Sequence, residues 1–184
     1  MVETILQAAT RVFTRLGYPQ ATTNRIAAAA GISVGSLYQY FSSKDAIAVE
    51  LLRRYRERLV ALVGDRMSAM SATSLESIVR ALVEALVRAE GIDPALHRVL
   101  IEQVLRTDAR GAIVGFEERL EALVARAIRA APAGARTPDP DVAAFVLVRS
   151  VLGTVHAAVV DRPGIDRGKV ADELTRWIVR YLGA

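Results

Sequence analysis

Residues 23–45, TNRIAAAAGISVGSLYQYFSSKD, constrain the fold most strongly because they predict two short helices joined by a tight turn. Gly31 stands where the turn needs a positive φ, which glycine adopts without steric cost. Ser33 can cap the helix that follows. Leu37 and Phe41, spaced i and i+4, give that second helix one buried edge. The segment therefore predicts a helix-turn-helix.

The side chains that the second helix leaves for solvent are small, hydroxylated or aromatic, and none is acidic: Val34, Gly35, Ser36, Tyr38, Gln39 and Tyr40. Such a surface suits a groove lined with phosphates. The amide of Gln39 can pair bidentately with adenine, which makes it the best candidate for reading a base. The two tyrosines would give hydroxyls to phosphates, and Gly35 and Ser36 would allow close approach. Thr23 and Arg25 would brace the opposite backbone.

Positive charge gathers in the same part of the chain. Residues 1–66 hold nine Lys or Arg against five Asp or Glu, whereas the remainder holds fifteen of each. This excess of positive charge indicates either a DNA-binding surface or a helix whose charged side chains simply face water. Lys44 stands at a helix start, where a cation is unfavourable unless an anion lies nearby. A DNA phosphate would supply that anion, and the alternative is a pair with Asp45 or Glu50.

Apolar periodicity and caps predict an all-α chain of nine helices, with no strand pattern. The predicted helices cover residues 2–16, 22–30, 34–40, 43–66, 75–89, 95–106, 113–128, 141–160 and 166–182. The Pro-, Gly- and Ala-rich residues 131–140 are predicted to form a flexible loop.

The composition argues against several other classes. The chain has no cysteine, and its two histidines, His97 and His156, lie on different helices without a repeated carboxylate spacing. No Gly-rich phosphate loop, nucleophile elbow or helical di-iron motif occurs, so no catalysis, cofactor or metal is predicted. The start lacks the features of a signal peptide. Residues 143–160 are barely long enough to span a bilayer and contain Arg149, so a buried helix in a soluble cytoplasmic protein is expected.

The two C-terminal helices predict how the chain associates. Residues 141–160 are apolar on every face, and the last helix carries an apolar stripe, so both need extensive burial. A four-helix interface between two copies would provide it. The expected interface comprises Val148, Leu152, Val155, His156, Val159, Leu174, Trp177, Ile178 and Tyr181. The alternative is that both helices form the core of a monomer.

The run TTNRIAAAAGIS, followed by GSLYQYF and SKD, resembles the DNA-binding segment of tetracycline-repressor (TetR) family regulators. The resemblance implies a helix-turn-helix domain at residues 1–46 and a helical effector and dimerisation domain at 47–184. It implies DNA contacts by Thr23, Arg25, Ser33, Val34, Gly35, Ser36, Tyr38, Gln39, Tyr40 and Lys44. The first helix starts at residue 2, so the basic N-terminal arm of many relatives is either missing or not included in this sequence.

The same resemblance implies a homodimer that binds a palindromic operator and is released by a small effector, which we expect to be apolar. Within the family, repression is more common than activation. Candidate lining residues of the effector cavity are Met67, Met70, Leu86, Leu100, Gln103, Val104, Phe116, Leu120, Phe145 and Arg149, although the apolar ones fit plain core as well. The competing hypothesis is a helical adaptor that binds another protein, which would have no need of the exposed tyrosines and Gln39.

Overall fold

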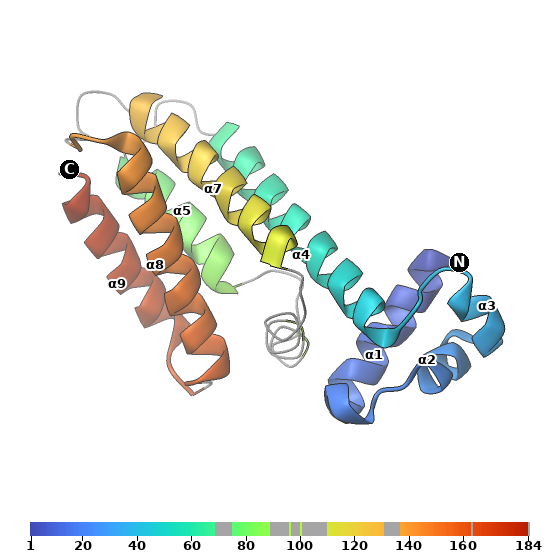
Figure 1. Ribbon diagram of the computed structural model, residues 1–184. Helices are drawn as coiled ribbons and strands as arrows, with labels where there is room; N and C mark the ends of the chain where they lie inside the picture. Colours follow the sequence, from blue (N-terminus) through green and yellow to red (C-terminus); the bar gives the residue numbers. More distant parts are fainter. Residues whose placement is uncertain are drawn as a thin grey trace. The chain divides into compact units, whose positions relative to one another are not determined.

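The computed structural model describes residues 1–68, 75–88, 96, 100, 110–130, 137–162 and 164–183. These residues form helices and connecting segments without a strand, which agrees with the predicted all-α class (Figure 1). The helices are α1 (Val2–Gln20), α2 (Thr23–Ala30), α3 (Val34–Tyr38), α4 (Lys44–Ser68), α5 (Leu75–Arg88), α7 (Arg110–Ala130), α8 (Pro140–Val160) and α9 (Arg167–Tyr181). The helix predicted at 95–106 lies outside the described residues except for Leu96 and Leu100, both helical and buried. The predicted count of nine helices is therefore not confirmed.

The described residues divide into two compact units. The first contains residues 1–56, 96, 100 and 110–112, and the second contains 57–68, 75–88, 113–130, 137–162 and 164–183. Helices α4 and α7 each continue from one unit into the other. The functional boundary predicted after residue 46 is a different division and stays a prediction.

Local capping explains where the helices of the first unit begin. The Thr22 hydroxyl accepts a hydrogen bond from the Arg25 amide at 3.2 Å, and the Ser33 hydroxyl accepts one from the Ser36 amide at 3.0 Å. The Ser43 hydroxyl accepts a third from the Ala46 amide at the start of α4, at 3.1 Å. Each cap satisfies an amide that has no partner within its own helix. The cap predicted from Ser33 is thus confirmed.

The first unit is closed by apolar side chains from four helices. Ile5 and Phe13 of α1, Ile26 of α2, Leu37 of α3 and Ile47 of α4 are all fully buried. Burial of this kind is what holds α2 and α3 in place, because helices of eight and five residues are too short to be stable alone.

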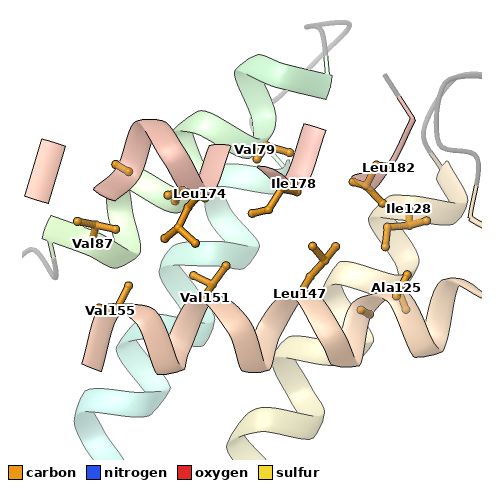
Figure 2. Packing of buried hydrophobic residues seen from close by; sticks show 14 of the residues in the cluster. Val79, Val87, Ala125, Ile128, Leu147, Val151, Val155, Leu174, Ile178 and Leu182 are labelled. Carbon is orange, nitrogen blue, oxygen red and sulfur yellow. The ribbon is translucent and has the colours of Figure 1, made fainter. Parts of the chain in front are cut away.

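The second unit packs α5, α7, α8 and α9 around one apolar cluster (Figure 2). Helix α5 lies along α9, and α8 contacts both. Leu147, Val151 and Val155 of α8 point toward Leu174 and Ile178 of α9. Asp139 and Asp166 cap the starts of α8 and α9, and each carboxylate accepts hydrogen bonds from two backbone amides.

Helix α8 has a buried side and an exposed side, although its sequence is apolar on both. Its length and mean hydropathy of 1.8 would allow it to cross a membrane by composition alone. In the structure eight of its residues are buried in the second unit. On the opposite side Val142 and Phe145 are 57% and 50% exposed. Within one copy of the chain α8 is therefore buried on one side, and its predicted burial on the other side by a second copy stays a prediction.

Several residues of the predicted dimer interface are buried within one copy of the chain. Val155, Val159, Leu174 and Ile178 belong to the core of the chain's own second unit, and Val148 is buried as well. These side chains are already covered by neighbouring helices, so they offer little surface to a partner. The predicted interface residues that keep exposed surface are Trp177 and Tyr181, and in part Leu152 and His156.

Gly31 gives a test of the turn. Its φ is +70° and a Cβ there would meet nothing within 4 Å, so an L side chain would cost only backbone strain. We expect Gly31→Ala to lower the free energy of unfolding by about 1–2 kcal/mol, and Gly31→Asn to lower it less because asparagine tolerates this conformation. Urea unfolding followed by circular dichroism measures both.

Gly35→Ala is the matched control, because Gly35 lies four residues away and has no positive φ. A Cβ added there would lie 3.8 Å from its nearest neighbour, the Ser33 hydroxyl oxygen. Alanine should raise stability there by about 1 kcal/mol. Equal effects at positions 31 and 35 would contradict the proposed role of the turn.

Candidate nucleic-acid interface

The turn between α2 and α3 is built from backbone hydrogen bonds. The Ile32 amide donates to the Ala27 carbonyl and the Gly31 amide donates to the Ala28 carbonyl, both at 3.1 Å. This pair is the Schellman motif that ends a helix at a left-handed residue. It satisfies two terminal carbonyls of α2 and fixes the direction in which α3 leaves.

Helix α3 presents one apolar edge inward and its other side outward. Leu37 is fully buried and Phe41 is almost buried. The residues around α3 that were predicted to contact DNA are exposed, apart from Ser36. Ser33 is the exposed cap of α3, and we call the others the α3 surface: Val34, Gly35, Tyr38, Gln39 and Tyr40. Ser36 is partly buried, and its hydroxyl lies 2.9 Å from that of Ser33. The structure thus brings together on one short helix the residues that were predicted to enter a groove.

Two other predicted contact residues are held by partners within the chain. The Thr23 and Tyr38 hydroxyls lie 3.1 Å apart and join the start of α2 to the end of α3. The Arg25 guanidinium donates to the Gln20 carbonyl at 2.6 Å, which turns its side chain toward the end of α1. Since arginine has five donors, this contact leaves Arg25 able to bind a second acceptor.

Lys44 is the predicted contact that the structure changes most. Its ammonium donates to the Tyr18 and Ala21 carbonyls, each at 3.0 Å, and lies 4.4 Å from the centre of the Tyr18 ring. Neither Asp45 nor Glu50 is its partner, contrary to the alternative drawn from the sequence. The backbone carbonyls at the end of α1, which carry partial negative charge, already bind the Lys44 ammonium, so a phosphate is not needed to explain a cation at this position.

Asp45 completes the junction, which the sequence did not reveal. Its carboxylate accepts a hydrogen bond from the Tyr18 hydroxyl. Burial of the phenol, together with that hydrogen bond and the negative charge of Asp45, raises the pKa of Tyr18. We call Tyr18, Ala21, Lys44 and Asp45 the α1–α4 junction. The only signal for it was the adjacent Lys-Asp pair, whose partners lie more than twenty residues away.

A second contact between α1 and α4 joins the start of α1 to a position further along α4. The Arg54 guanidinium donates to Glu3 at 2.5 Å and to Glu50 at 2.8 Å. Glu50 also accepts two hydrogen bonds from Arg53, each at 2.8 Å. The hydrogen bonds from Arg53 and then Arg54 lower the pKa of Glu50 to about 2 despite its partial burial. Much of the positive charge in this part of α4 is therefore paired within the chain.

The electrostatics around α3 remain favourable for an anionic partner. Residues 4–44 contain no Asp or Glu, although they contain Arg11, Arg15, Arg25 and Lys44. Arg11 donates to the Ala29 carbonyl at the end of α2, at 3.2 Å. No acidic side chain of this segment would repel a phosphate backbone.

The residues predicted to line an effector cavity fall into several groups. Met70, Gln103 and Val104 lie outside the described residues, and the side chain of Met67 is not described. Leu86 is packed against the core of the second unit, where Phe116 and Leu120 are buried, whereas the buried Leu100 belongs to the first. These apolar side chains could line a cavity or fill a core.

Phe145 and Arg149 do not lie inside the chain, which corrects their assignment as lining residues. Phe145 is half exposed on the outer side of α8. Arg149 forms ion pairs with Glu117 and Glu121 of α7, and its guanidinium lies 5.3 Å from the centre of the Phe145 ring. Within the part of the chain that is described, no group of three His, Asp or Glu could hold a metal.

Comparison with known proteins agrees with the geometry of the first unit. Residues 5–51 match the family described as bacterial regulatory proteins, tetR family, and residues 74–182 match the tetracyclin repressor-like C-terminal domain. The HTH-type transcriptional regulator YhgD of Bacillus subtilis (strain 168) is 23% identical over 194 aligned residues, covering 98% of this chain and 95% of YhgD.

Two further proteins extend the comparison. The HTH-type transcriptional repressor KstR2 of Rhodococcus jostii (strain RHA1) is 37% identical over 101 residues, which is 54% of this chain and about half, 47%, of KstR2. The structure of the regulator FadR from Bacillus subtilis in complex with stearoyl-CoA superposes with a TM-score of 0.74 at 17% identity, covering 98% of this chain and 99% of FadR. The chain therefore belongs to the TetR family of bacterial transcriptional regulators, which are DNA-binding proteins and not enzymes.

Proposed function

We propose that this protein is a ligand-responsive transcriptional repressor that binds a palindromic operator as a homodimer in the bacterial cytoplasm. The observation that carries the proposal is the α3 surface, whose aromatic, amide and small residues are exposed together within a segment free of acidic residues. Repression is supported by the similarity to the repressor KstR2. An adaptor protein would have no use for such a surface.

The proposed homodimer is supported by the geometry of DNA and by the outer side of α8 and α9. Two helix-turn-helix segments must lie roughly 34–36 Å apart to enter successive major grooves, so each needs a fixed partner. Trp177 and Tyr181 stack on each other, with ring centres 5.9 Å apart, and remain exposed on α9. Exposed aromatic side chains of this size are typical of protein interfaces.

A small apolar effector would act by changing the distance between the two helix-turn-helix segments. The second unit offers buried apolar side chains for it, among them Leu86, Phe116 and Leu120. The fold neighbour FadR was solved with stearoyl-CoA, so a ligand with a long acyl chain is a reasonable first candidate. An effector that favours a different spacing lowers DNA affinity, and by linkage DNA lowers effector affinity by the same factor.

Gln39 tests the proposed base readout. We expect Gln39→Ala to relax the base preference at one position of each operator half-site by about 1–3 kcal/mol, because the bidentate contact to adenine is lost. Selection of bound sequences from a random pool, followed by gel shifts, measures the preference. Tyr40→Phe is the control: it removes a hydroxyl proposed to bind phosphate, so it should weaken binding to all sequences alike. Equal losses on all sequences from both variants would contradict the assignment.

Lys44 tests whether the α1–α4 junction or a phosphate contact is its main role. We expect Lys44→Met to lower the free energy of unfolding by about 3 kcal/mol, since two hydrogen bonds from a charged group are lost. Operator affinity should fall on all sequences. Its dependence on salt concentration should keep the same slope, because the slope counts phosphate contacts. Urea unfolding and gel shifts between roughly 50 and 200 mM salt measure the two effects.

Lys169→Met is the matched control, because Lys169 is the only other lysine and lies exposed at the start of α9. It should change neither stability nor operator affinity. A flatter salt dependence for Lys44→Met without a loss of stability would instead assign Lys44 to a phosphate.

The effector proposal predicts coupling between ligand and operator. Titration calorimetry with acyl-CoA thioesters of increasing chain length should show affinity rising by about 0.8 kcal/mol for each buried methylene. The same compounds should lower the affinity for the operator by a factor of about 5–150. The protein–operator complex should in turn bind each compound more weakly than the free protein does, by the same factor. If no hydrophobic compound both binds and releases DNA, the ligand-gated part of the proposal is wrong.

A further inference from the structure

Helix α2 carries the turn and α3, yet few apolar contacts hold it on α1. Of its residues, Ile26 and Ala27 are the two that are buried. Its last four residues are all alanine, and their side chains are too short to form the ridges by which helices interlock. Apolar packing therefore leaves the angle of α2 on α1 weakly determined.

Two arginine side chains attach α2 to α1, one near each end of α2. Arg25, in the first turn of α2, donates to the carbonyl of Gln20, the last residue of α1, at 2.6 Å. Arg11, near the middle of α1, donates to the carbonyl of Ala29 in the last turn of α2, at 3.2 Å. A single attachment would leave a pivot, whereas two separated attachments define an angle.

Arg11 acts on the same turn that sets the direction of α3. The carbonyls in the last turn of a helix have no partner within the helix. The amides of Gly31 and Ile32 satisfy the carbonyls of residues 28 and 27, and the Arg11 guanidinium satisfies the next one, that of Ala29. A cation is also favoured at this end of a helix by the helix dipole. Arg11 thus completes the end of α2 from the neighbouring helix.

The choice of a carbonyl as the partner of Arg11 suits a segment that binds DNA. An ion pair with Asp or Glu would place a negative charge beside the phosphate backbone. Residues 4–44 contain no acidic residue, and Arg25 and Lys44 also donate to backbone carbonyls. The segment is therefore held together by its cations, and its net positive charge is not cancelled.

We propose that Arg11 is a positioning residue for operator binding, which sets the angle at which α2, the turn and α3 leave α1 without itself contacting DNA. The inference rests on the proposed operator binding by the α3 surface and adds a residue outside the predicted contacts. Loss of Arg11 leaves α3 at the productive angle for a smaller fraction of the time, and the affinity for the operator falls with that fraction. Binding to unrelated DNA, which depends on charge and not on base contacts, is affected less.

Arg11→Met and Arg15→Met form the matched pair that tests the inference. Arg15 lies one turn further along α1 and is exposed, and no hydrogen bond attaches it to another helix within the described part of the chain. Both variants lose one positive charge and keep an unbranched apolar side chain, so the difference between them isolates the contact with Ala29. Circular dichroism verifies that each variant keeps its helix content.

Gel shifts with an operator selected from a random pool, and with an unrelated duplex of the same length, give the ratio of specific to non-specific affinity. Arg11→Met should lower this ratio about three- to tenfold, as expected if the productive fraction falls to about 0.1–0.3. Arg15→Met should leave the ratio unchanged. Arg11→Lys, which keeps both the charge and a donor, should recover part of the ratio.

The salt dependence of operator binding separates positioning from a direct phosphate contact. The slope should be the same for Arg11→Met and Arg15→Met. If the slope for Arg11→Met is smaller by about one, Arg11 binds a phosphate itself, and the proposed role is wrong.

Hydrogen exchange of the free protein measures the effect on the turn without DNA. Arg11→Met should speed exchange of the Gly31 and Ile32 amides, because the end of α2 opens more often. The Ala46 amide, which the Ser43 hydroxyl accepts at the start of α4, should exchange at the parent rate. Arg15→Met should change none of these amides.

The possible failures are distinguishable. Equal affinity ratios for the two methionine variants, or equal exchange of the Gly31 and Ile32 amides in both, would overturn the positioning role of Arg11 and leave operator binding intact. A parent protein that binds every duplex with the same affinity would overturn the proposed operator binding itself.

Discussion

The orientation of α3 depends on the α1–α4 junction. Lys44 binds two carbonyls at the end of α1, and Asp45 accepts the Tyr18 hydroxyl, so the first turn of α4 is tied to the chain segment that leads into α2. Hydrogen bonds to a charged group contribute about 1.5–3 kcal/mol each, and the contact with the Tyr18 ring adds about 0.5–2 kcal/mol. Few contacts in so small a unit are as strong.

The Glu3–Arg54–Glu50 contacts extend the same connection along α4. Arg54 lies almost three turns beyond Lys44 and reaches the first turn of α1, so α1 is held near both of its ends. These ion pairs are partly exposed and individually weak. Their value is geometric, because two separated attachments stop α1 from pivoting on α4. The first half of α4 and the helices beneath it should therefore respond to a displacement of α4 as one body.

How much could be predicted from the sequence depended on the distance between interacting residues. The Gly31 turn and the caps by Ser33 and Ser43 were predictable because each involves residues within four positions of one another. The exposed α3 surface followed from the same local periodicity. The partners of Lys44 within the chain were missed because its acceptors lie 23 and 26 residues away, at the end of another helix. The local rule for cations at helix starts correctly predicted a group with negative charge near Lys44, but it could not identify that group.

Helix α8 shows the same limit for packing. Its sequence is apolar on all sides, so no periodicity distinguishes the residues that face the core from those that face outward. The helices packed against α8 determine which side is buried. The valines of α5 cover one side, whereas Glu117 and Glu121 of α7 hold Arg149 at the surface. Once Arg149 is held there, the residues three and four positions away on the same side must be at least partly exposed too, Gly153 among them. Arg149, which interrupts the apolar sequence of α8, thus determines which side of this helix is exposed.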